Sequence, residues 1–186
     1  TNTKNKQEYD YTDENGNDVT SSYNGEAGLQ LGFLDRLVLG IYKGNINLAF
    51  SSEMTGESKI LINRNIIERA KKALPYLMYD ENPYTVIGDD GKIYWVLDAY
   101  TISSSYPYSQ YTEIEHEDQT RDINYIRNSV KVIIDAYNGT MKYYITDRTD
   151  PIAMAYRNIY STLFVNLDEE IPEDISEHFV YPEFLY

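Results

Sequence analysis

The sequence predicts an α+β fold in which N-terminal and C-terminal helices flank an antiparallel sheet of about four strands. Three observations support this prediction. Apolar residues recur with helical spacing near both ends of the chain, the middle of the chain changes to the two-residue period of strands, and turn residues punctuate that middle region. Strands grouped in one stretch, rather than alternating with helices, are typical of antiparallel sheets.

The N-terminal segment differs from the rest of the chain. Residues 1–28 are acidic and contain the run Asp13-Glu14-Asn15-Gly16-Asn17-Asp18, with hardly any aliphatic side chains. Such a composition predicts a flexible arm or loop. Residues 29–186 are therefore predicted to form a single α+β domain.

Two amphipathic helices are predicted in the first half of the domain. The first has an apolar stripe and ends at Gly44; the stripe comprises Leu34, Leu37, Val38, Ile41 and Tyr42. The second ends or kinks at Pro75, and its apolar positions are Ile62, Ile66, Ile67, Ala70, Ala73, Leu74 and Leu77.

Two hairpins are predicted in the middle of the chain. The first joins residues 84–87 to 92–100 through a Gly-Asp-Asp-Gly turn. The second joins residues 129–137 to 140–146, with Asn138-Gly139 supplying the two positive φ angles of a type I′ turn.

The C-terminal region contains a third and a fourth predicted helix. Asp150 is placed to cap a helix that has Pro151 at its first position. The apolar face of that helix comprises Ile152, Ala155, Tyr156, Ile159, Tyr160 and Leu163. A short final helix follows Pro172 and holds Ile175 and Phe179.

Composition excludes several functional classes. The 186 residues carry a net charge of −14, which opposes nucleic-acid binding because binders of phosphate backbones present a basic surface. The absence of cysteine excludes disulfides, thiolate nucleophiles and metal sites built on sulfur. No stretch reaches the roughly 18 consecutive apolar residues of a membrane span. The chain begins at Thr1 without methionine, which suggests a fragment excised from a longer protein.

An Asp-Ala-Tyr sequence ends two apolar runs. It occurs at residues 98–100 and again at 135–137, so strand alternation places Asp98, Tyr100, Asp135 and Tyr137 on the face opposite the apolar residues. These four residues are candidates for a ligand or ion site. The alternative is that each aspartate initiates a turn by bonding its own backbone.

Tyrosine is unusually abundant, with 20 residues against five phenylalanines and one tryptophan. Tyr106 and Tyr108 lie with Tyr100 and Tyr111 around a serine-rich loop. Tyrosine offers a large rigid contact area with a polar tip, which favours binding of a protein or glycan partner. The alternative is that the rings pack along the sheet with their hydroxyl groups at solvent.

No catalytic residue set, cofactor or metal site is assigned from the sequence. Asp98 and Asp135 could supply the paired carboxylates of a hydrolase, although acidic residues are abundant. His116 lies in the run Glu113-Ile114-Glu115-His116-Glu117-Asp118, which is either a solvated loop or a site for a hard cation. An EF-hand-like spacing that begins at Asp13 fails, since Asp18 occupies its glycine position.

Several runs together resemble the uncharacterised protein family 0182 of large bacterial membrane proteins. The main runs are GKIYWVLDAYT (91–101), YPYS (106–109) and NYIRNSVK (124–131). Supporting runs are IIER (66–69), DENPY (80–84) and DAYNGT (135–140). The resemblance covers roughly residues 33–186 and leaves the acidic arm outside it.

The resemblance implies location rather than chemistry. Family members look like several N-terminal transmembrane helices followed by a long soluble region, of which this chain would be a segment on the extracytoplasmic side of the cell membrane. The membrane helices of the same full-length protein are then its expected partners. The expected function is a non-catalytic interaction or assembly module; the alternatives are an envelope-associated hydrolase or a domain that binds a small ligand or cation.

Overall fold

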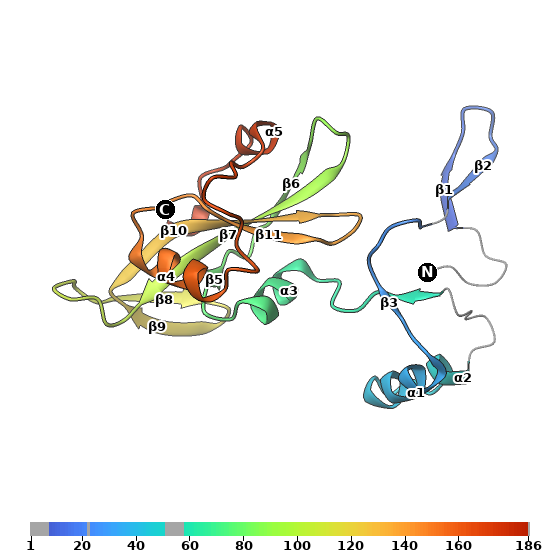
Figure 1. Cartoon of the computed structure of the whole chain (residues 1–186), viewed down its shortest axis with the longest axis horizontal. Helices are drawn as coiled ribbons and strands as arrows, with labels where there is room; N and C mark the ends of the chain where they lie inside the picture. Colours follow the sequence, from blue (N-terminus) through green and yellow to red (C-terminus); the bar gives the residue numbers. More distant parts are fainter. Residues whose placement is uncertain (1–7, 22, 51–57, 186) are drawn as a thin grey trace. The chain divides into compact units, whose positions relative to one another are not determined.

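The computed structural model describes residues 8–21, 23–50 and 58–185. Contacts divide the chain into two compact units, Thr1–Arg64 and Asn65–Tyr186 (Figure 1). The predicted division at residue 28 into an arm and a single domain stays a prediction.

The first unit contains short elements. They are β1 (Glu8–Thr12), β2 (Asp18–Ser21), β3 (Leu29–Gln30), α1 (Phe33–Tyr42), α2 (Asn47–Phe50) and β4 (Lys59–Ile60). β1 pairs with β2 and β3 pairs with β4, both antiparallel. The β1–β2 hairpin lies inside the segment predicted as an arm or loop. Its turn closes because the Asp13 carboxylate accepts hydrogen bonds from the backbone amides of Asn15 and Asn17, at 2.9 and 2.8 Å.

The predicted helix before Gly44 is confirmed as α1. Gly44 has a φ of 66°, and the next amide, of Asn45, donates to the carbonyl oxygen of Gly40 at 2.8 Å, which ends the helix. The apolar stripe of α1 is nevertheless largely exposed, since Leu34 is 72%, Val38 67% and Ile41 67% accessible. Amphipathic spacing therefore predicted the helix but not a covering element within the described residues.

The second unit contains the remaining elements. They are α3 (Ile66–Ala73), β5 (Met78–Tyr79), β6 (Tyr84–Ile87), β7 (Ile93–Ser103), β8 (Thr112–His116), β9 (Gln119–Ile123), β10 (Tyr125–Asp135), β11 (Met141–Ile145), α4 (Pro151–Ile159), α5 (Glu173–Ser176) and the 3-10 helix η1 (Glu183–Leu185). The predicted α+β class with an antiparallel sheet is confirmed. The four-strand estimate was approximate, because the main sheet has five strands and β8–β9 forms a separate hairpin.

The five strands of the main sheet occupy four positions across it, because β5 and β6 pair with the same edge of β7. β11 pairs with β10, β10 pairs with β7, and the far edge of β7 is shared by β5 and β6, all antiparallel. The β7–β10 pairing places Asp98 opposite Lys131 and Tyr94 opposite Asp135. Between Arg127 and Val130 the register shifts by one residue on β10, which marks a β-bulge.

Both faces of the sheet are covered. On one face, α3 and α4 pack against the predicted apolar side of β7 and β10, including Leu97, Val132 and Ile134. On the other face, Val96 and Ile133 pack against the C-terminal segment, which contributes Ile175 and Phe179. A central sheet between two covering layers explains why β7 and β10 are buried along most of their length (Figure 1).

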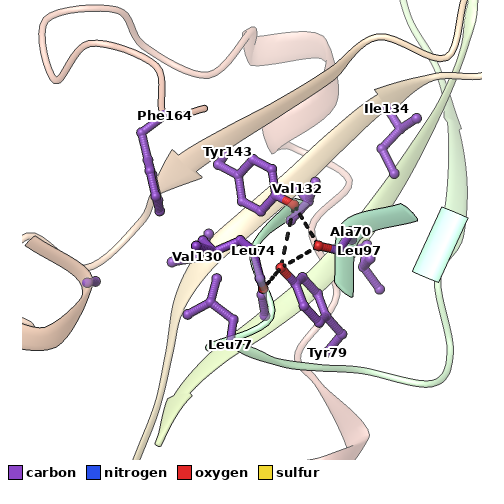
Figure 2. Packing of buried hydrophobic residues seen from close by; sticks show 12 residues of the cluster. Ala70, Leu74, Leu77, Tyr79, Leu97, Val130, Val132, Ile134, Tyr143 and Phe164 are labelled. Atoms are coloured by element: carbon purple, nitrogen blue, oxygen red, sulfur yellow. Dashed lines mark hydrogen bonds between the residues drawn. The ribbon is translucent and has the colours of Figure 1, made fainter. Parts of the chain in front are cut away.

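Two tyrosine hydroxyl groups meet the end of α3 inside the core. The Tyr79 hydroxyl lies 3.1 Å from the carbonyl oxygen of Ala70 and 2.7 Å from that of Leu74. The Tyr143 hydroxyl donates to the same Ala70 carbonyl at 3.2 Å (Figure 2). The Ala70 carbonyl also accepts the Leu74 amide at 2.9 Å, so the hydroxyls add to an existing bond there. The Leu74 carbonyl lies past the last turn of α3, and the Tyr79 hydroxyl satisfies it where water is excluded.

The cap predicted for the third helix is confirmed. Asp150 accepts hydrogen bonds from the amides of Ile152 and Ala153 at 2.9 and 3.3 Å, with Pro151 at the first helical position. The predicted buried face was partly wrong, because Ala153 is the buried residue and Ile159 is 68% exposed. The small Ala153 side chain allows close approach to the sheet, and α4 ends at Ile159 before the predicted stripe is complete.

The predicted type I′ turn at Asn138-Gly139 was wrong. Only Gly139 has a positive φ, of 69°, whereas a type I′ turn needs two such residues. The Asp135 carboxylate accepts from the amides of Tyr137 and Asn138 at 2.8 and 2.7 Å, so β10 ends at Asp135 and a longer loop follows. The hydrogen bonds to the Asp135 carboxylate therefore set the conformation of the turn.

Candidate functional site

The two Asp-Ala-Tyr sequences lie in neighbouring strands, but at different places along them. Asp98, Tyr100 and Asp135 occupy the same face of the sheet, as alternation predicted. Because β7 and β10 are antiparallel and Asp98 is opposite Lys131, four residues of β10 separate the two aspartates. At roughly 3.3 Å per residue that separation is about 13 Å. The structure therefore does not bring Asp98 and Asp135 together.

Asp98 is a partner in a buried ion pair. Its carboxylate contacts the ammonium group of Lys131, and both side chains are 6% exposed. Asn128 donates a further hydrogen bond to Asp98 at 2.8 Å. The Lys131 ammonium lies 5.1 Å from the ring centre of Phe179, which belongs to the covering C-terminal segment. Asp98 thus has little access to a ligand from solvent.

Asp135 caps its own turn, which was the alternative interpretation of the Asp-Ala-Tyr sequence. It also lines a cavity of about 480 Å³ on the face of the sheet that the C-terminal segment covers. That cavity is lined by Asp89, Asp90, Tyr94, Ile133, Asp135, Thr140, Lys142, Tyr144, Pro172, Asp174 and Ile175. The carboxylate of Asp174 accepts the Asp89 amide at 2.8 Å, and that of Asp90 accepts the Tyr94 hydroxyl at 2.8 Å. These contacts hold the cavity wall together.

The candidate tyrosines separate into buried and exposed groups. Tyr100 is fully buried and its hydroxyl donates to the Asp80 carboxylate. Burial raises the pKa of Tyr100, and the hydrogen bond to Asp80 raises it further. By contrast, Tyr106 is 37% exposed and Tyr108 is fully exposed. Tyr137, in the turn that follows β10, is 54% exposed.

The loop that carries Tyr106 and Tyr108 is held by specific contacts. The ring of Tyr106 stacks on Tyr125 with 4.5 Å between the ring centres. Asn124 accepts from the Tyr106 amide at 2.9 Å and donates to its carbonyl oxygen at 2.8 Å. Tyr108 has a φ of 64°, which is uncommon for a residue with a bulky side chain. Tyr108 therefore projects from an anchored loop.

An acidic cavity lies beside the β8–β9 hairpin. Its volume is about 500 Å³, and it is lined by Asp80, Glu81, Asn82, Glu115, His116, Glu117, Asp118, Glu183 and Phe184. One ring nitrogen of His116 and one carboxylate oxygen each of Glu81 and Glu117 lie within 4.8 Å of one another. This cluster is the one group of possible metal ligands found among the described residues.

The sequence identified only part of this cluster. His116 and Glu117 were in the acidic run that left a cation site open, and that run forms most of β8 and its turn into β9 rather than a loop. Glu81 was not a candidate, because it lies 35 positions before His116 in the sequence. The hairpin was missed since each strand carries few apolar residues and its turn, Glu117-Asp118, contains no glycine.

Comparisons with known proteins agree with one another. The profile described as "Uncharacterised protein family (UPF0182)" matches residues 1–186. The chain is 48% identical to a UPF0182 protein of Clostridium novyi, over 95% of this chain and 18% of that protein. It is 48% identical to a UPF0182 protein of Clostridium tetani, over 100% of this chain and 20% of that protein. It is 47% identical to a UPF0182 protein of Clostridium botulinum, over 96% of this chain and 19% of that protein.

These matches correct one expectation from the sequence. The resemblance was expected to begin near residue 33, but the family profile and the Clostridium tetani protein both extend over the N-terminal segment. The chain spans about a fifth of the length of these relatives. No solved structure matches it. Within the described residues, no helix has the length and apolar character needed to cross a membrane. The chain belongs to the uncharacterised protein family UPF0182.

Proposed function

We propose that this chain is a non-catalytic interaction and assembly module within a longer, multi-spanning membrane protein, on the extracytoplasmic side of the cell membrane. The observation that carries the proposal is the exposed apolar stripe of α1. Its partner is another part of the same polypeptide, because the relatives are about five times longer than this chain.

The stripe is suited to docking. Leu34, Val38, Ile41 and Tyr42 recur at intervals of four, three and one residues, so they lie along one side of the helix. Each is more than 60% exposed. Burial of one such side chain contributes about 1.5–3 kcal/mol, so four of them favour a stable contact. Contiguous exposed apolar residues of this kind typically mark interaction surfaces.

The extracytoplasmic side is supported by charge. A net charge of −14 is repelled by the anionic lipids of the cytoplasmic leaflet. A hydrolytic role receives no support from Asp98 and Asp135, since one is held in an ion pair and the other caps a turn.

Site-specific photocrosslinking in the full-length protein tests the assembly role. A photoreactive residue at Val38 should form crosslinks to peptides outside the 186-residue segment, which mass spectrometry identifies. The matched control position is Ile87, which is 71% exposed but lies in the second unit. Equal crosslinking from Val38 and Ile87, or none from Val38, would reject the stripe as the docking surface.

Thiol labelling tests the side of the membrane. The segment has no cysteine, so Tyr108→Cys introduces its single thiol at a fully exposed position. In the full-length protein with its other cysteines replaced, a membrane-impermeant maleimide should label this variant in intact cells. Labelling that requires permeabilised cells would place the segment inside the cell.

A second candidate function is binding of a protein or glycan partner by the loop with Tyr106, Tyr108 and Tyr111. The full exposure of Tyr108 on an anchored loop favours it. Soluble peptidoglycan fragments should then shift the NMR signals of Tyr108 and Tyr111 in the 186-residue chain, but not those of exposed Tyr76. Shifts of equal size at all three tyrosines, or none, would contradict glycan binding.

A further inference from the structure

We infer that Glu81, His116 and Glu117 form a binding site for a divalent transition-metal ion, with Zn²⁺ as the best-matched ion. One nitrogen and two carboxylate oxygens lie within 4.8 Å of one another at the wall of a cavity of about 500 Å³. The inference is independent of the proposed interaction role, and it concerns a different part of the chain from α1.

The backbone brings the three residues together. His116 is the last residue of β8, and Glu117 and Asp118 form the turn to β9 with φ angles of 54° and 56°. Glu81 comes from the connection between β5 and β6, and its carboxylate accepts a hydrogen bond from the Glu117 amide at 3.0 Å. The position of each ligand is therefore set by the chain fold.

His116 provides the observation that points to a metal rather than to a solvated acidic cluster. The residue is only 8% exposed, and its ring makes an edge-on contact with Phe184 at 5.7 Å between centres. Its Nε2 atom lies 2.7 Å from the carbonyl oxygen of Tyr79. A carbonyl oxygen only accepts, so Nε2 carries the proton and donates it.

This hydrogen bond leaves Nδ1 as the nitrogen with a free lone pair in the neutral ring. Among the described residues Nδ1 has no hydrogen-bond partner. Histidines that bind metals typically donate their other ring N–H to a backbone carbonyl or a carboxylate, which fixes the tautomer and the ring orientation. The bond from His116 to Tyr79 provides that orientation before any metal binds.

The donor set selects the class of ion. Ca²⁺ and Mg²⁺ prefer sites made entirely of oxygen, whereas a neutral imidazole with two carboxylates suits Zn²⁺. In a tetrahedral zinc site with bonds of about 2.0–2.1 Å, neighbouring ligand atoms are about 3.3 Å apart. The observed limit of 4.8 Å requires a contraction, which is feasible because the Glu81 and Glu117 side chains are exposed at the surface.

Lys71 contacts one of the three proposed ligands. Its ammonium group forms an ion pair with the Glu117 carboxylate, and the two side chains are 29% and 37% exposed. Ion pairs that are partly exposed to solvent contribute at most about 1 kcal/mol. A dication can therefore displace Lys71 from Glu117, and Lys71 acts as a competitor for that carboxylate.

Calorimetric titration of the 186-residue chain with Zn²⁺ alone tests the inference. The wild type should bind one Zn²⁺ per chain with micromolar or tighter affinity. Glu81→Gln and Glu117→Gln should weaken binding at least about tenfold, since each removes a ligand charge. Glu115→Gln is the matched control, because Glu115 lines the same cavity but is outside the cluster, and its affinity should stay within about twofold of wild type.

Two further measurements make the test specific. Lys71→Met should tighten Zn²⁺ binding, because it removes the competing ammonium group. Zn²⁺ should also move the NMR resonance of His116 Nδ1 more than that of Nε2, a change that a purely structural histidine would not show.

Three results would overturn the site. These are the absence of stoichiometric Zn²⁺ binding, an equal loss of affinity in Glu115→Gln, and tighter binding of Ca²⁺ or Mg²⁺ than of Zn²⁺. The first excludes a site, the second indicates diffuse attraction to acidic groups, and the third excludes the nitrogen ligand.

Discussion

The ammonium group of Lys131 contacts the carboxylate of Asp98 in the interior of the second unit, where both side chains are 6% exposed. Asp98 was a candidate ligand-binding residue because it is polar and ends an apolar run. The partner strand instead supplies a lysine directly opposite it. A buried charge with a partner of opposite sign is tolerated, whereas the same charge alone is costly.

Removal of one partner of this ion pair should be strongly destabilising. We expect Asp98→Ala or Lys131→Ala to lower the free energy of unfolding by about 3–5 kcal/mol, because an unpaired charge remains buried. Denaturation by urea measures this change. The double variant Asp98→Leu, Lys131→Met should recover most of the loss.

The exposed pair of Lys142 and Glu169 provides the control for this prediction. Their charged groups are 3.3 Å apart, but the side chains are 58% and 51% exposed. Glu169→Ala should therefore change the unfolding free energy by no more than about 1 kcal/mol. A cost for Asp98→Ala as small as that for Glu169→Ala would contradict the energetic role of burial.

The Tyr79 hydroxyl should contribute to stability through the carbonyl groups at the end of α3. Tyr79→Phe leaves the Leu74 carbonyl without its 2.7 Å partner in a buried setting, so we expect a loss of about 1–3 kcal/mol. Tyr144→Phe is the control, since Tyr144 is also buried but no hydrogen bond of its hydroxyl is found within the described residues. Equal effects in thermal or urea unfolding would mean that the hydroxyl bonds contribute little.

Alkaline pH should destabilise the second unit. Burial raises the pKa of Tyr79, with a further contribution from Tyr143, and burial likewise raises the pKa of Tyr100 and Tyr143. A raised folded-state pKa means that the native state keeps its protons where the unfolded chain loses them. The resulting stability is complete below the unfolded tyrosine pKa of about 10 and declines as the pH rises above it.

Urea titrations at increasing pH, combined with tyrosinate absorbance, measure this effect. The urea concentration at the unfolding midpoint should decrease at pH values above about 10. A fraction of the tyrosines should ionise only on unfolding. Tyr79→Phe should reduce the dependence of the midpoint on pH. Full ionisation of all tyrosines in the folded chain near their ordinary pKa would contradict the prediction.

Asp150 should stabilise the fold as a charged cap. Burial alone raises the pKa of its carboxyl group, but hydrogen bonds from Thr101, Tyr125 and the Ala153 amide outweigh burial and lower the pKa overall. Its contribution is thus present above the unfolded aspartate pKa of about 3.9 and is lost as the pH falls through the lower folded value.

Substitution at Asp150 separates the cap from the charge. Asp150→Ala should cost about 2–4 kcal/mol, because the cap is lost and the Thr101 and Tyr125 hydroxyls lose their acceptor. Asp150→Asn should cost less and should flatten the decline in unfolding free energy that sets in as the pH falls below about 5. An unchanged acid dependence in Asp150→Asn would assign that decline to other carboxylates.

Local sequence signals determined much of the secondary structure. Three helix-end signals each act within one helical turn, so they can be recognised from the sequence alone. They are the end at Gly44, the break at Pro75 and the Asp150-Pro151 cap. The alternation in β7 and β10 also predicted which side of each strand is apolar. Where signals were weak, as in β8 and β9, the sequence did not identify the strands.

The contacts of the candidate residues depend on how distant segments of the chain pack together. The pairing of Asp98 with Lys131 and the approach of Glu81 to His116 join residues 33 and 35 positions apart, and no local pattern specifies such meetings. From the residues alone, the chain could be described as acidic, cysteine-free, α+β and similar to an uncharacterised protein family. The register of β7 against β10 and the placement of the β8–β9 hairpin decided which charges are neutralised and which remain available to bind, because those contacts depend on pairing between distant segments.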